Sequence, residues 1–146
     1  MTDLSSLIKR PTGATPQALA MPAAPAASAV EASLDRMEAI NRELGEAALR
    51  GGDGSGAQIV SLRYNFTTEC GTLLLAMCED ERIFGDRTLF VDMQTALDAL
   101  RTRITNHQLR WQGDRIEADP AAYRQAAHGI DQAVIAFVAD ARAALG

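Results

Sequence analysis

The side chains best able to do chemistry in this sequence are Cys70, Cys78, His107 and His128, together with an acidic cluster at 79–86. A catalytic thiol needs a basic neighbour that lowers its pKa. Both cysteines instead fall on the apolar stripe of a predicted helix, where burial raises the pKa of a thiol. We therefore expect two buried and reduced thiols, which favour a reducing compartment such as the cytoplasm.

The histidines and the acidic cluster do not have the spacing of a metal site. A di-metal centre in a helical bundle needs a glutamate three residues before a histidine on the same helical face. Isoleucine and glutamine stand at those positions before His107 and His128. Neighbouring helical residues point about 100° apart, so the three acidic residues at 79–81 cannot converge on one cation. The sequence predicts no catalytic residue, no cofactor and no metal ion.

His107 and Arg110 are the pair that suggests group transfer. An exposed imidazole on a helix, with a basic residue one turn further on, could carry a phosphoryl group whose charge the basic residue balances. The segment from His107 to Arg110, with Ile116 and Ala118 beyond it, resembles the phosphohistidine motif of histidine phosphotransfer domains. These domains are four-helix bundles, and the resemblance implies phosphotransfer through His107.

The segment also departs from that family pattern. Trp111 and Glu117 stand where the family has small glycines, and a turn predicted at 113–114 interrupts what should be continuous helix. The other interpretation of His107 is a structural or surface histidine at the end of a helix. His128, on the polar side of its helix, is expected at the surface.

Charge and hydropathy exclude several classes of partner. The net charge is −5, whereas nucleic acids and anionic membranes select clustered positive charge. No apolar run has the length of a membrane span. We expect neither a nucleic acid nor a membrane as a partner.

Apolar residues at helical spacing predict four amphipathic helices. The first follows Ser28 and Glu31, which match a capping box, and the last follows Asp119 and Pro120, a typical helix start. The expected helices cover residues 29–50, 57–84, 87–110 and 120–145.

Two short stretches remain ambiguous. Between residues 58 and 67, apolar and polar residues also alternate with the period of a strand, so strand followed by helix is an alternative to one long helix. Leu109 and Trp111 facing Ile116 could form a small hairpin around the turn.

Four apolar stripes on segments joined by short connections favour an all-α fold, an antiparallel four-helix bundle, over residues 29–146. Residues 1–28 are rich in alanine and proline and are too poor in large apolar residues to form a core. We expect them to be a flexible, disordered tail, which could order on binding or act as an export signal.

With no catalytic constellation, the leading hypothesis is a non-enzymatic protein–protein interaction module. It would be an adaptor, a chaperone-like protein or an assembly subunit in a bacterial complex, with a protein partner or a second copy as its ligand. The alternative is a histidine phosphotransfer module acting through His107. A third possibility is a small-molecule sensor with a pocket between the first and second helices, ranked lower because the sequence offers no polar residues that would orient a ligand.

Overall fold

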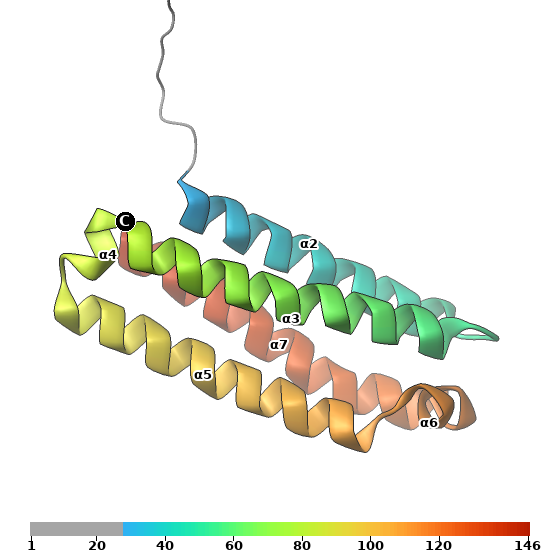
Figure 1. Cartoon of the computed structure of the whole chain (residues 1–146). Coiled ribbons are helices and arrows are strands. Elements are labelled where there is room, and N and C mark those ends of the chain that lie inside the picture. Colours follow the sequence, from blue (N-terminus) through green and yellow to red (C-terminus); the bar gives the residue numbers. More distant parts are fainter. Residues whose placement is uncertain (1–27) are drawn as a thin grey trace, which may run out of the picture.

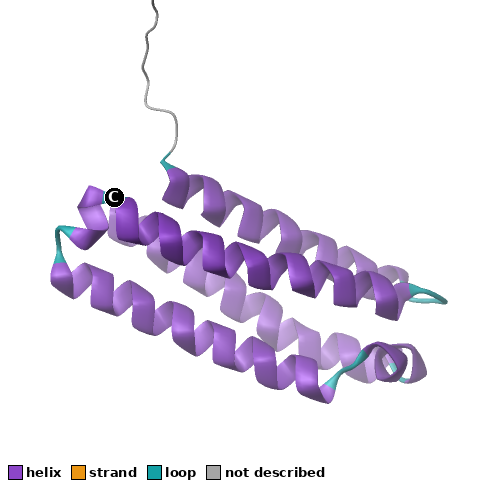
Figure 2. Ribbon diagram, in the orientation of Figure 1, coloured by secondary structure: helices purple, strands orange, loops and turns teal. Residues whose placement is uncertain are grey.

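The computed structural model describes residues 28–146, and four long helices in this part of the chain run alternately up and down (Figure 1). Every element in this range is helical (Figure 2). The elements are α2 (Ala29–Arg50), α3 (Ser55–Glu79), α4 (Glu81–Phe84), α5 (Arg87–Arg110), α6 (Gly113–Ala118) and α7 (Pro120–Leu145). The predicted four-helix bundle is confirmed, and the strand considered for 58–67 is wrong. The tail predicted for 1–28 lies outside the described residues, except for Ser28.

Most helices in the structure begin and end at the capping residues that the sequence predicts. Ser28, Asp86 and Asp119 each accept a hydrogen bond from a backbone N–H in the first turn of the helix that follows. At the other end of α2, Gly51 has a φ of 59°, a left-handed conformation that glycine adopts without steric cost.

The helix expected over 57–84 breaks at Asp80. This residue has extended backbone angles (φ −95°, ψ 115°), and its carboxylate accepts a hydrogen bond of 3.0 Å from the backbone N–H of Arg82. The Arg82 guanidinium also lies 2.7 Å from the same carboxylate. Asp80 therefore ends α3 and caps α4. The apolar pattern hid the break because Ile83, beyond it, still reaches the core.

The small hairpin considered around Trp111 is a short helix, α6, instead. Trp111 and Ile116 are buried, whereas Leu109 is 67% exposed and does not pack against them. The Gly56 N–H at the start of α3 donates a 2.9 Å hydrogen bond to Oε2 of Glu117. A Cβ at Gly56 would lie 2.9 Å from the carbonyl carbon of Gly113, so this close approach of α3 and α6 requires glycine.

Two apolar clusters fill the bundle. The larger lies towards the α4 end and is built mainly from aliphatic side chains of all four long helices, including Leu34, Leu73, Leu97 and Val138. The smaller lies at the α6 end. It consists of Ala47, Ala48, Ile59, Leu62, Trp111, Ile116 and Tyr123. None of the helices described in residues 28–146 is long and apolar enough to cross a membrane.

Candidate functional site

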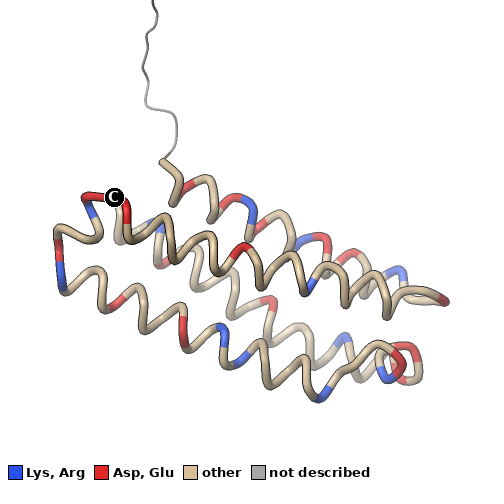
Figure 3. The backbone as a smooth tube through the Cα atoms, in the orientation of Figure 1, with Lys and Arg blue, Asp and Glu red and all other residues tan. Residues whose placement is uncertain are grey.

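Helix α3 carries few charges, and most of them face inwards. Its charged residues are Arg63, Glu69 and Glu79, so it is almost uncoloured in the view by charge (Figure 3), whereas α2 carries charges along its whole length. Arg63 is 8% exposed and Glu69 is 9% exposed. The solvent-exposed side of α3 is therefore uncharged from residue 57 to residue 78.

Large apolar side chains stand on that uncharged side. Tyr64 is 74% exposed, Leu75 is 69% exposed, and Val60 is also exposed. Helical spacing places small and uncharged residues on the same side as these three. We call this the α3 surface: Ala57, Val60, Tyr64, Thr67, Thr68, Gly71, Leu75 and Cys78.

The inward charge of Glu69 is satisfied by α2. Ser33 Oγ donates a 2.6 Å hydrogen bond to Glu69 Oε2, and Arg36 Nε lies 2.9 Å from Glu69 Oε1. Burial opposes ionisation of Glu69, but the hydrogen bonds from Arg36 and Ser33 outweigh it and lower its pKa. This network holds the Glu69 side of α3 against α2. Together with the buried apolar stripe of α3, it leaves the α3 surface facing outwards.

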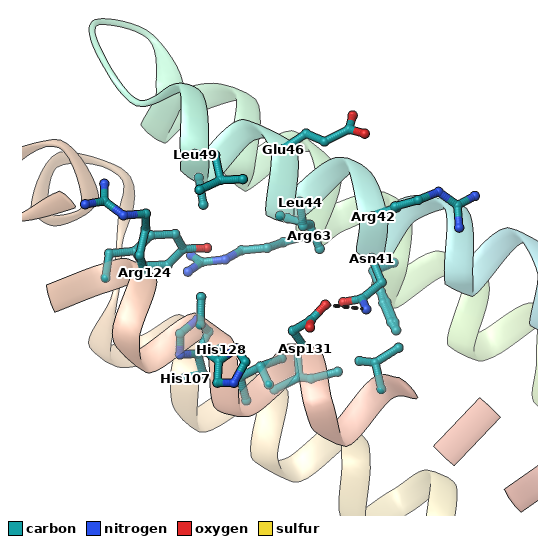
Figure 4. Close-up of a pocket in the computed structure, with 18 of the residues that line it drawn as sticks. Asn41, Arg42, Leu44, Glu46, Leu49, Arg63, His107, Arg124, His128 and Asp131 are labelled. Atoms are coloured by element: carbon teal, nitrogen blue, oxygen red, sulfur yellow. Dashed lines mark hydrogen bonds between the residues drawn. The ribbon is translucent and has the colours of Figure 1, made fainter. Parts of the chain in front are cut away.

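A pocket of about 410 Å³ opens between α2 and α7, and its lining includes members of both core clusters (Figure 4). At one wall, Asn41 Nδ2 donates a 2.8 Å hydrogen bond to Asp131 Oδ1. Residues of α3 and α5 also contribute to the lining. The full lining is Asn41, Arg42, Leu44, Gly45, Glu46, Ala48, Leu49, Arg63, Phe66, Ile104, His107, Gln108, Tyr123, Arg124, Ala127, His128, Ile130, Asp131 and Val134.

Arg63 reaches from α3 into this pocket (Figure 4). Its Nη1 donates a 2.5 Å hydrogen bond to the carbonyl oxygen of Trp111, and its guanidinium carbon lies 5.7 Å from the centre of the Tyr123 ring. Burial lowers the pKa of Arg63, although a guanidinium stays protonated at neutral pH. No carboxylate of residues 28–146 forms an ion pair with it.

His107 also lines this pocket, beside Tyr123, with the two ring centres 5.7 Å apart. It is partly buried. Burial and the nearby charge of Arg63 lower its pKa to about 4, so the imidazole is neutral at pH 7. The side chain of Arg110 is exposed, and no hydrogen bond links it to His107 within the described part of the chain. His107 is thus half-buried in the pocket wall rather than fully exposed, and phosphotransfer through His107 and Arg110 stays a prediction.

The two cysteines lie in different environments. Cys70 is buried as expected, and burial raises its pKa to about 11. Cys78 is exposed, so the prediction of two buried thiols is wrong for this residue. Eight residues advance a helix by about 800°, so Cys78 stands some 80° away from Cys70 around the axis, on the side that faces solvent. His128 is at the surface, at the rim of the pocket, as expected.

The burial of Arg63 was not predicted, although the sequence contains a signal for it. Arg63 follows Ile59 by four residues and precedes Phe66 by three, which places it on the same helical face as two core residues. The position predicted for a pocket, between the first and second helices, also differs from the structure. The cavity lies between the first and last long helices, α2 and α7, not between the first and second, and it does contain polar side chains.

Comparison with protein-family models, with curated proteins and with solved structures finds no match to this chain.

Proposed function

We propose that this chain is a non-enzymatic protein–protein interaction module, a subunit or adaptor of a larger assembly, that docks through the α3 surface. The observation that carries the proposal is the orientation of α3: its charges at 63 and 69 point into the bundle, while Tyr64 and Leu75 point out. Charged residues usually cover the solvent side of a surface helix. Exposed apolar side chains gathered on one face mark an interaction site.

Gly71 adds a second argument, because no contact among residues 28–146 explains a glycine at this position. It lies in the middle of α3, where glycine costs about 1 kcal/mol relative to alanine. A Cβ at this position would meet no atom within 4 Å, so glycine is not required by packing among the described residues. A small residue at the centre of an exposed helical face allows the backbone of another helix to approach closely.

The partner we propose is a second copy of this chain. A surface without charge is best covered by another surface without charge, because a charged group buried there would lose its hydration without gaining an ion pair. A twofold axis near Gly71 would pair two α3 helices antiparallel and bring Tyr64 of one copy towards Cys78 of the other. Each copy then presents the same patch, which is the rule in twofold dimers.

The test places the same charge on two equally exposed leucines. Leu75 is 69% exposed on α3, and Leu109 is 67% exposed on α5. Leu75→Glu should convert the dimer to a monomer, since each interface would bury two uncompensated carboxylates. Leu109→Glu should leave the dimer intact. The molar mass is measured by size-exclusion chromatography with light scattering across a dilution series.

Both variants should keep the helical circular dichroism of the parent, because leucine and glutamate have similar helix propensities. A parent chain that is monomeric at every concentration would overturn the proposed dimer. Equal behaviour of the two variants would overturn the choice of the α3 surface.

A further inference from the structure

Two hydrogen-bond donors in the pocket between α2 and α7 lack an acceptor among the described residues. They are Nη2 of Arg63 and Nε2 of Gln108, and both atoms are buried. The Tyr123 hydroxyl interacts with the Arg63 guanidinium, but it is a neutral group and makes no hydrogen bond of normal geometry with Nη2. An unpaired buried donor costs about 1–3 kcal/mol, and more when the group is charged. Native proteins leave few such groups without a partner. Two of them in the lining of one cavity point to an acceptor that enters from outside the chain.

The charges of the pocket favour an anionic acceptor. The lining contains three arginines and two carboxylates, whereas the whole chain has a net charge of −5. One of those carboxylates, Asp131, already accepts a hydrogen bond from Asn41. Arg63, at 8% exposure, has no carboxylate partner among residues 28–146. A carboxylate on a ligand would pair with its charge and supply the missing acceptor.

Most of the cavity wall is apolar, so we expect the anion to carry an apolar body. Aliphatic and aromatic side chains from all four long helices form the walls. They include Leu44, Phe66, Ile104, Ile130 and Val134. A volume of about 410 Å³ lies within the range of small-molecule sites, which run from about 300 to 1,000 Å³.

We propose that this pocket binds an organic carboxylate with an apolar body, oriented by Arg63. Both donor atoms are buried in the pocket wall, so Arg63 and Gln108 rotate slightly to donate hydrogen bonds to the carboxylate. The apolar body of the ligand lies along the walls between α2 and α7. His107 is neutral at pH 7 and adds no second charge beside the ligand. The site is independent of the α3 surface, because Arg63 and Phe66 enter it from the inner side of α3.

The test compares two probes of equal length by isothermal titration calorimetry with the full chain: octanoate, and 1-octanol, which lacks the charge. Octanoate should bind more tightly than 1-octanol. Arg63→Met should weaken octanoate binding by about tenfold or more, the loss expected for one charge-assisted hydrogen bond, and should change 1-octanol binding by less than about threefold. Arg124→Met, at the rim, should have the smaller effect on octanoate.

A second variant keeps the proposal testable if Arg63→Met does not fold. Ala127 lines the pocket, and Ala139 is exposed on the same helix outside it. Ala127→Met should fill the cavity and abolish octanoate binding, whereas Ala139→Met should not. The proposal is overturned if octanoate fails to bind the parent chain, if it binds no better than 1-octanol, or if Ala127→Met binds as well as Ala139→Met.

Discussion

Leu73→Ala is expected to lower the free energy of unfolding by about 2–5 kcal/mol, the range for truncating a fully buried leucine. Leu73 is completely buried in the larger core cluster, on the side of α3 that also carries Cys70 and Met77. The loss combines the transfer free energy of the removed methyl groups with the cavity that they leave. Urea unfolding followed by circular dichroism measures it.

The matched control for this change is Leu109→Ala. Leu109 is 67% exposed on α5, so its truncation removes little buried surface, and we expect a change within about 0.5 kcal/mol. Both changes place alanine in a helix and therefore gain the same small propensity term. Equal losses at the two positions would mean that α3 does not face the core through Leu73.

The second prediction is that the free energy of unfolding falls in mild acid, because His107 is held neutral in the folded chain. The pKa of His107 is about 4 in the folded chain, against 6.5 for the unperturbed side chain. Between these values the unfolded chain binds a proton that the folded chain does not, so stability falls as the pH falls from about 7 towards 4. From pH 7.5 to pH 5 the expected loss is about 1 kcal/mol, because His107 is only partly buried and solvent screens part of the effect.

His107→Gln should remove most of this loss, because glutamine does not titrate. The measurement is urea unfolding of both chains at several pH values between 7.5 and 5. The carboxyl groups of Glu31, Glu69 and Asp80 have lowered pKa values, and their contribution is lost only at lower pH. Parallel pH profiles for parent and variant would show that His107 is not held neutral by its surroundings, Arg63 and Tyr123.

The bundle could be predicted from the sequence because its determinants are local. The capping side chains of Ser28, Asp86 and Asp119 are adjacent in sequence to the backbone groups that they bind. The apolar stripes need only helical spacing. The cap at Asp80 could not be predicted in the same way. Asp80 is the middle one of three consecutive acidic residues, and the sequence does not indicate which of the three caps α4.

The candidate sites depend on contacts between helices, which spacing within one helix does not specify. The inward orientation of Glu69 depends on Ser33 and Arg36 of α2, 33 or more residues away in sequence. The pocket exists because the bundle leaves a gap between two core clusters, and no periodicity in a single segment encodes a gap. For Arg63, the spacing predicts burial but not the absence of a carboxylate partner.

The most direct test of the α3 surface is a distance between two copies of the chain. Gln58 is exposed on α3 but outside the α3 surface, and Cys70 is buried, so a nitroxide label should attach to position 58 in a chain that carries Gln58→Cys and Cys78→Ser. In the proposed antiparallel dimer the two labelled positions lie thirteen residues on either side of the axis at Gly71. Double electron–electron resonance should then give one distance of about 40 Å, from a rise of 1.5 Å per residue. No dipolar coupling, or a distance far longer than this, would contradict self-association through α3.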